Sequence, residues 1–292
     1  MKWQRLRRSS NVDDLRRRGP ASRRAGLGRI PLRIGGGRSG VIVIVVLIVA
    51  YFVGGPEMLM QLLGGGSSNT SVETNAQSSS PNDQASQFVS AILASTEDEW
   101  QRLFASSGSR YEPPRLTLFA GAVQSACGYA TAASGPFYCP ADQRVYLDTS
   151  FFDELSRMGG AGDFAQAYVI GHEIGHHIQT LLGTSRQVRE AQSGAREAAA
   201  NRLQVAMELQ ADCYAGVWAN LANQTQPLLE PGDVDEGMAA AAAIGDDRLQ
   251  RGAGRRVTPD SFTHGTSAQR QQWLQTGLRS GDPQACDTFS TQ

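Results

Sequence analysis

The pattern of apolar and polar residues in the middle of the chain predicts one long amphipathic helix over residues 163–182. Asp163 followed by Gln166 forms a capping-box signature at its start, and Gly183 stands where a C-terminal cap is expected. The apolar positions recur at helical spacing as one stripe, formed by Phe164, Ala167, Tyr168, Gly171, Ile174, Ile178 and Leu181. A helix with such a stripe packs one face against the rest of a domain.

The segments on either side of this helix predict a small sheet before it and further helices after it. Apolar and aromatic runs bounded by Gly and Pro predict strands at Leu116–Ala122 and Arg144–Asp148. Segments rich in Ala and Leu predict a second long helix over Arg186–Ala222 and shorter helices over Val234–Arg251 and Ser267–Leu278. The fold class that follows is α+β and mostly helical.

A separate apolar run near the N-terminus, Val41–Val53, contains thirteen residues without a charge. As a helix it would be about 20 Å long, shorter than the roughly 30 Å hydrocarbon core of a bilayer. Extension to residues 34–55 supplies the missing length, with Arg38 able to reach the headgroups. A cleaved signal peptide is the alternative, but the preceding basic region is long and Pro56 follows the small residues at the end of the run. We therefore expect an uncleaved transmembrane helix at 34–55.

The net charge of −1 conceals two segments of opposite charge. Residues 1–40 contain 12 of the 27 basic residues and two acidic ones, which gives +10, whereas the remainder carries −11. The positive-inside rule then assigns residues 1–33 to the cytoplasm and the domain beyond the helix to the outside, as in a single-pass protein of the cell membrane. We expect no nucleic-acid partner, because the Arg-rich tail lacks interleaved aromatic residues beyond Trp3 and membrane orientation explains its charge.

Composition divides the chain into four parts. Residues 1–33 form the basic tail and 34–55 the predicted membrane helix. Residues 56–86 are mostly polar, with a run of Gly, Ser and Asn that is typical of a flexible linker. Residues 87–292 are long enough for one domain with a hydrophobic core.

All four cysteines lie in this last part of the chain. An even number of cysteines on the presumed outer side of a membrane favours disulfides. Pairing of Cys127 with Cys139 closes a short loop between two strand-like runs and leaves Cys213 to pair with Cys286. Zinc ligation by thiolates is the alternative, but no C-x-x-C spacing supports it.

The helix predicted at 163–182 carries the motif H-E-x-x-H. His172 and His176 are four residues apart, so their imidazoles project from one face and can reach a single Zn²⁺ at about 2.0–2.1 Å. Glu173 follows the first histidine and can act as general base toward a water on that ion. His177 points about 100° away from His176 around the helix axis, and we expect it to pack rather than to bind the metal.

A catalytic zinc needs a third protein ligand and an open fourth position. The second long helix offers Glu208 and Asp212, again four residues apart on one face. We expect Glu208 to ligate the metal and Asp212 to accept the remaining N–H of a ligand histidine, which fixes the histidine tautomer. A solvated acidic face is the alternative, but the neighbouring Cys213, Tyr214 and Trp218 do not suit a solvated surface.

Five separated blocks of the sequence resemble the putative neutral zinc metallopeptidase family of bacterial, membrane-anchored proteins. The blocks are GPFYCPADQRVYLDTSFF (135–152), GHEIGHHIQTLLG (171–183), ELQADCYAGVWA (208–219), AAAIGDDRLQ (241–250) and SFTHGTSAQRQQW (261–273). The resemblance covers nearly all of residues 100–290. It implies a zincin-like domain of gluzincin style that binds one Zn²⁺ through His172, His176 and Glu208, with Glu173 as the base.

Two further residues are candidates for stabilising the negative charge that develops on a substrate carbonyl. His264 lies in one of the blocks that resemble the family, and a hydrogen bond from it to the oxyanion is one interpretation. A structural role for this histidine is the other. Tyr168, one turn before His172, is a weaker candidate for the same role. Asp246 and Asp247 belong to another such block, and the sequence assigns them no chemistry.

Together these features favour a membrane-anchored zinc endopeptidase that hydrolyses a peptide or protein substrate outside the cytoplasmic membrane. The strand at Arg144–Asp148 is expected to line the cleft and to pair with an extended substrate. The alternative is a non-catalytic envelope protein with a structural zinc and a partner-binding surface. Three protein ligands plus water would indicate the enzyme, and a fourth protein ligand, with His264 as first candidate, would indicate the non-catalytic protein.

Overall fold

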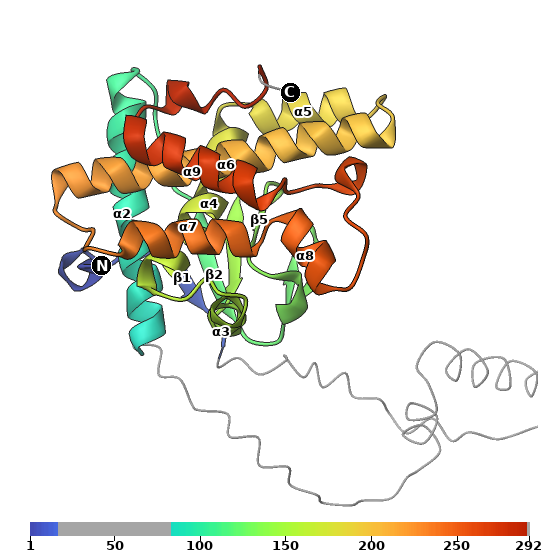
Figure 1. Ribbon diagram of the computed structural model, residues 1–292. Helices are drawn as coiled ribbons and strands as arrows, with labels where there is room; N and C mark the ends of the chain where they lie inside the picture. The colour runs from blue at the N-terminus through green and yellow to red at the C-terminus, as the bar shows by residue number, and fades with distance from the viewer. Residues whose placement is uncertain (17–82, 291–292) are drawn as a thin grey trace, which may run out of the picture. The chain divides into compact units, whose positions relative to one another are not determined.

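A four-stranded sheet lies beside a group of packed helices in the computed structural model, which describes residues 1–16 and 83–290 (Figure 1). The strands, in spatial order, are β1 (Val12–Asp14), β2 (Arg115–Phe119), β6 (Arg144–Asp148) and β5 (Phe137–Cys139). β1, β2 and β6 are parallel, whereas β5 is antiparallel to β6 and forms an edge of the sheet. A separate antiparallel hairpin consists of β3 (Ala122–Ser125) and β4 (Gly128–Thr131).

Helices make up the larger part of the described chain. In chain order the α-helices are α2 (Gln84–Ser106), α3 (Ser150–Arg157), α4 (Asp163–Leu181), α5 (Thr184–Gln192), α6 (Glu197–Thr225), α7 (Asp233–Ala243), α8 (Asp246–Gly252) and α9 (Ser267–Ser280). Short 3-10 turns are η1 (Trp3–Arg5), η2 (Ala132–Ser134), η3 (Pro259–Ser261) and η4 (Pro283–Cys286). The prediction of a mostly helical α+β fold is confirmed.

Two of the predicted helices are each divided in two. The helix expected over Arg186–Ala222 is interrupted between α5 and α6, around Gly194, because Arg196 adopts an extended conformation before α6. The helix expected over Val234–Arg251 is interrupted at Gly245, where a Cβ would lie 2.4 Å from the backbone nitrogen of Ser267. A tertiary contact therefore requires glycine at this extended position between α7 and α8. α2 was not predicted.

α4, α6 and α9 approach one another closely because glycines stand at their contacts. A Cβ on Gly175 of α4 would lie 2.9 Å from backbone atoms of Ala211 on α6. A Cβ on Gly277 of α9 would lie 1.9 Å from the carbonyl oxygen of Cys213. This close packing brings polar side chains of three helices, far apart in sequence, into one site.

Both predicted disulfides are confirmed. Cys127–Cys139 joins the turn of the β3–β4 hairpin to the edge strand β5. Cys213–Cys286 joins α6 to η4. Each bridge therefore fixes an element that packs against one of the helices of the site, β5 against α4 and η4 against α6.

Residues 1–16 belong to the same compact unit as residues 83–290. β1 pairs with β2 in the sheet, and the buried ring of Trp3 packs edge-on against Phe88 of α2. The α-amino group of Met1 donates a hydrogen bond of 2.8 Å to Asp163, in the first turn of α4. The N-terminal segment thus supports both the sheet and the start of α4.

These contacts correct the predicted membrane topology. A single crossing at 34–55 would put residues 1–33 and the C-terminal domain on opposite sides of a membrane, yet residues 1–16 pair directly with that domain. Within the described ranges, no helix has the length and apolar character needed to cross a membrane. The segment 34–55 itself lies outside the described residues. The predicted single-pass topology at the cell membrane, with residues 1–33 on one side and the C-terminal domain on the other, is therefore wrong.

Candidate metal centre and active site

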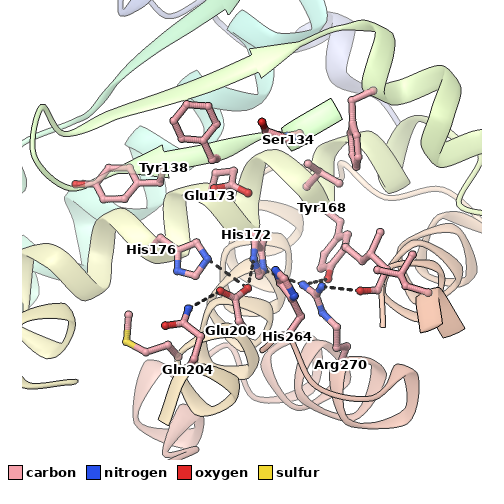
Figure 2. A pocket seen from close by; sticks show the side chains of 18 of the residues that line it. Ser134, Tyr138, Tyr168, His172, Glu173, His176, Gln204, Glu208, His264 and Arg270 are labelled. Atoms are coloured by element: carbon pink, nitrogen blue, oxygen red, sulfur yellow. Dashed lines mark hydrogen bonds and ion pairs between the residues drawn. The ribbon is translucent and has the colours of Figure 1, made fainter. Parts of the chain in front are cut away.

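Three potential metal ligands meet where α4 packs against α6 (Figure 2). His172 and His176 project from α4 and Glu208 from α6, and one ligand atom of each lies within 4.8 Å of the others. Oε2 of Glu208 is 3.2 Å from Nε2 of His172 and 3.6 Å from Nε2 of His176. Ligand atoms about 2.0–2.1 Å from a tetrahedral Zn²⁺ lie roughly 3.4 Å apart, so the three residues fit one zinc ion.

A buried carboxylate orients the first of these histidines. Nδ1 of His172 lies 2.8 Å from Oδ1 of Asp212, which is fully buried one turn after Glu208. Because an ionised carboxylate can only accept a hydrogen bond, Nδ1 carries the proton and Nε2 is left for the metal. The structure therefore places Asp212 where the sequence analysis expected it.

Arg270 of α9 holds Asp212 in turn. Its guanidinium donates to both carboxylate oxygens of Asp212 at 2.8 Å, and only 1% of Arg270 is exposed. The hydroxyl of Tyr168 donates to Asp212 at 2.5 Å and accepts from Arg270 at 3.1 Å. Since its proton is engaged by Asp212, Tyr168 supports the metal ligand and is not placed to stabilise an oxyanion.

Two glutamines orient the other two ligands. Nδ1 of His176 donates to the side-chain oxygen of Gln179 at 2.9 Å, which leaves Nε2 facing Glu208. The amide nitrogen of Gln204 donates to Oε1 of Glu208 at 3.0 Å, which leaves Oε2 at the centre of the site. Each of the three candidate ligands is therefore held by a hydrogen bond on the side away from the shared centre.

Sequence reasoning missed Arg270, Gln179 and Gln204. The two glutamines could have been found from helical spacing, because Gln179 is three residues after His176 and Gln204 four residues before Glu208. Arg270 is 58 residues from Asp212 along the chain, and no local pattern links them.

The electrostatics of the site favour positive charge between the ligands. Burial by itself lowers the pKa of His172, but attraction and hydrogen bonds to Asp212, together with a hydrogen bond to Glu208, raise it to about 9. Burial raises the pKa of Glu208, but the two histidines exceed this effect and hold it well below its usual range. Burial likewise raises the pKa of Asp212, and Arg270 and His172 lower it to about 2. Two ionised carboxylates thus surround a centre suited to a cation.

The metal-ligand group lies on the wall of an open cavity of about 570 Å³. Glu173 lines this cavity next to the three ligands but is not a member of their group (Figure 2). The opposite wall includes Ser134 and, from the edge strand, Tyr138 (Figure 2). Phe137 of the same strand also lines the cavity. A substrate in the cavity would therefore lie between α4 and β5.

His264 lines the same cavity from the loop before α9, with its side chain 50% exposed. It lies outside the ligand group, and its Nδ1 is 3.3 Å from Oδ1 of Asp246. The other oxygen of Asp246 accepts backbone N–H groups from Thr263, His264 and Gly265 at 2.6–3.1 Å. Asp246, which had no role in the sequence analysis, therefore holds the loop that presents His264.

His177 points away from the metal ligands, as predicted from its position on the helix. Nε2 donates to the carbonyl oxygen of Glu112 at 2.7 Å, so Nδ1 accepts from the hydroxyl of Tyr138 at 3.1 Å. Burial lowers the pKa of His177 to about 4, which keeps the imidazole neutral. Its role is to join the edge strand β5 to α4.

Two histidines and a glutamate as ligands, a neighbouring glutamate and an open cavity define a site of the zinc-metallopeptidase class. Comparison with known sequences gives the family directly. A profile of the family described as "Putative neutral zinc metallopeptidase" matches residues 1–289, and the chain belongs to this family.

Relatives in the family are similar over most of their length. The chain is 47% identical over 291 residues to the uncharacterized protein YpfJ of Escherichia coli K12, covering 99% of both chains. It is 43% identical over 217 residues to the uncharacterized protein Rv2575 of Mycobacterium tuberculosis H37Rv, covering 70% of this chain and 72% of that one. No solved structure matches the chain, so no structural neighbour supports the zincin-like, gluzincin-style label. That part of the predicted fold class is withdrawn.

Proposed function

We propose that the protein is a zinc-dependent endopeptidase that hydrolyses bonds within extended peptide segments. The observation that carries the proposal is a group of three ligands on the wall of an open cavity. Among residues 1–16 and 83–290, no fourth His, Cys, Asp or Glu belongs to that group. A structural zinc is closed by four protein ligands, whereas a catalytic zinc keeps one position open for water or substrate.

Glu173 is the general base in this proposal. Glu173 lines the cavity, and only 7% of the residue is exposed, so its surroundings shield it from most of the solvent. Glu173 takes a proton from the attacking water and delivers it to the leaving amine. When bound, zinc supplies a Lewis acid that polarises the scissile carbonyl.

His264 is the proposed donor to the scissile carbonyl oxygen. In its imidazolium form, Nδ1 donates to Asp246 while Nε2 donates into the cavity, where negative charge develops during the reaction. Its half-exposed side chain leaves that nitrogen accessible to a substrate. Asp246 is a positioning residue that acts through His264.

The strand proposed to pair with the substrate is β5 rather than β6. The sequence analysis selected Arg144–Asp148, but this strand lies inside the sheet, with β2 on one side and β5 on the other. Phe137–Cys139 is at the edge and faces the cavity with its first two residues. An edge strand offers free backbone N–H and C=O groups to an extended peptide, which suits cleavage within a chain.

The test uses the purified full chain loaded with zinc and a library of internally quenched peptides. Glu173→Gln should keep one zinc per chain and lose nearly all turnover, because it retains the shape of the side chain but not the proton acceptor. Glu190→Gln, an exposed substitution of the same kind on α5, serves as the control and should behave as the parent. Full activity of Glu173→Gln, or X-ray absorption spectra that show four protein ligands on the zinc, would contradict the proposal and favour a structural zinc.

A further inference from the structure

The cavity extends along α4, and its two ends differ in chemistry. Val169 and His176 both line it, and seven residues of helix separate them by about 10 Å. The end near Val169 is mostly apolar, because Phe151, Met158 and Ile244 pack there with Val169. Leu249 also lines the cavity, next in sequence to Arg248, which donates to the carbonyl oxygen of Met158. The end beyond His176 is mostly polar, formed by Ser185, Arg189, Gln192 and Gln204 with Val188 and Met207.

Each end also carries one charged side chain without a partner. Arg189 of α5 is exposed at the polar end, and in the part of the chain that the structure describes no ion pair or side-chain hydrogen bond engages its guanidinium. Glu154 of α3 is exposed at the apolar end and is equally unpaired among the described residues. Arg189 therefore adds a positive charge to the wall of the polar end, and Glu154 adds a negative charge to the wall of the apolar end, where Arg248 also donates to the carbonyl oxygen of Met158.

The chain direction of the edge strand β5 determines how a peptide paired with it would be oriented in the cavity. Before β5, a Cβ on Gly135 would lie 3.7 Å from the ring of Phe151, at the apolar end. Within β5, the hydroxyl of Tyr138 reaches His177, toward the polar end. The strand thus runs from the apolar end to the polar end, and Figure 2 shows Ser134 and Tyr138 in the same order. A peptide that pairs antiparallel to β5, the more stable pairing, begins at the polar end.

We infer that the cavity selects peptides with an acidic residue on the N-terminal side of the scissile bond and an apolar residue on its C-terminal side. This inference rests on the proposed peptidase function and names its substrate class. Arg189 attracts the acidic residue, and the apolar end accepts the other side chain, while Glu154 repels an acidic side chain placed there.

Binding to the inactive Glu173→Gln variant, loaded with zinc, tests the acidic preference without requiring cleavage. The probes are fluorescently labelled peptides with one Leu, identical except for Glu, Gln or Lys two residues before it. The Glu peptide should bind roughly three- to tenfold more tightly than the Lys peptide, and the difference should shrink in high salt. A peptide with Glu two residues after Leu should lose the advantage, because the order of the two side chains is reversed.

Charge reversal identifies the residue responsible. Arg189→Glu should invert the preference so that the Lys peptide binds more tightly. Arg186→Glu is the matched control, because Arg186 is also exposed on α5 but does not line the cavity, and it should keep the parental preference. Equal effects of the two substitutions would overturn the assignment to Arg189, since they would reflect the net charge of α5.

The apolar end is tested in the same way. Leu249 is 42% exposed and lines the cavity, whereas Leu182 is 53% exposed and does not. Leu249→Glu should weaken binding of the Leu peptide several-fold relative to its Ser counterpart, and Leu182→Glu should leave the ratio unchanged. If Leu249→Glu leaves the ratio unchanged, the assignment of the apolar end is wrong.

Binding and cleavage together separate the inference from the function on which it rests. If the parent protein cleaves peptides without charge preference and Arg189→Glu changes nothing, the substrate inference is wrong and the peptidase function stands. If the Glu peptide binds selectively but no peptide is cleaved, the peptidase function fails while the charge selectivity of the cavity holds.

Discussion

Arg270 donates one hydrogen bond to each carboxylate oxygen of Asp212, both at 2.8 Å and both buried. Asp212 orients His172, so a residue of α9 determines how a candidate metal ligand on α4 is held by α6. The candidate metal centre is therefore built by three helices, although the potential ligands come from two.

Arg270→Met should destabilise the fold and weaken zinc binding together. Breaking a buried ion pair by removing one partner costs about 3–5 kcal/mol, because the remaining charge is buried without compensation. We expect a lower midpoint of thermal unfolding and a weaker zinc affinity in competition with a chelator. Arg279→Met, an exposed change on the same helix, should have little effect on either. Parental zinc affinity in Arg270→Met would show that Asp212 does not need Arg270 to orient His172.

Gly175→Ala should separate α4 from α6. The added methyl group would lie 2.9 Å from backbone atoms of Ala211, which cannot move without moving the helix that carries Glu208. Overpacking of this kind costs about 1–3 kcal/mol. Urea unfolding should show this loss, with weaker zinc binding. Gly194→Ala, where no atom lies within 4 Å, is the control and should unfold like the parent. Unchanged stability of Gly175→Ala would mean that α4 and α6 have room for the added methyl group between Gly175 and Ala211.

Asp246→Ala should lower kcat and leave the zinc content unchanged. Removal of the carboxylate frees the loop that presents His264, so the proposed oxyanion donor is no longer held in place. His264→Ala should reduce kcat by roughly 10²–10³, the usual cost of losing one such donor. The double variant should be no slower than His264→Ala, because Asp246 acts through that residue. Asp235→Ala, an exposed change on α7, is the control. Loss of zinc in His264→Ala would instead indicate that His264 is a ligand of the zinc ion.

The ion pairs of Asp13 should make the stability that β1 contributes to the sheet depend on pH. Hydrogen bonds from Arg115, then from Arg144, lower its pKa to about 2, against a smaller opposing effect of burial. Because the pKa in the folded state is depressed, the stabilisation is fully present above the ordinary value near 3.8 and is lost as pH falls toward 2.

Asp13→Asn should therefore lower stability at neutral pH by roughly 1 kcal/mol, since the pair is partly exposed to solvent. Below about pH 2 the variant and parent should unfold alike. Asp153→Asn, an exposed change on α3, should not show this pH dependence. A constant difference between Asp13→Asn and the parent from pH 7 to 2 would exclude the ion pair as its cause.

The sequence predicted the features of this site that depend on local spacing. α4 and its two histidines follow from helical periodicity, and Asp212 follows from Glu208 by the same spacing. In each of these two pairs the residues are near each other because one helix carries both, α4 for the histidines and α6 for the carboxylates. The two disulfides could be predicted for a different reason, because four cysteines allow few pairings.

The features that the sequence did not predict depend on contacts between distant segments. Arg270 reaches Asp212 from another helix, and Gly245, between α7 and α8, lies too close to Ser267 for a side chain. The charge of the N-terminal region suggested a membrane-oriented tail, but Asp13 and its arginine partners show that part of this region belongs to the sheet. Charge patterns report solvation and orientation, and they do not distinguish a free tail from a strand that pairs with a remote partner.

The parallel pairing of β1 with β2 has a consequence for the order of folding during synthesis. β1 emerges from the ribosome before β2, because Arg115 of β2 is 102 residues further along the chain than Asp13 of β1. The contact of Met1 with Asp163 spans 162 residues. Until β2 is made, β1 lacks the strand with which it pairs. Pairing at such separations is slow, so β1 is expected to join the sheet late, after α4 and its neighbours have folded.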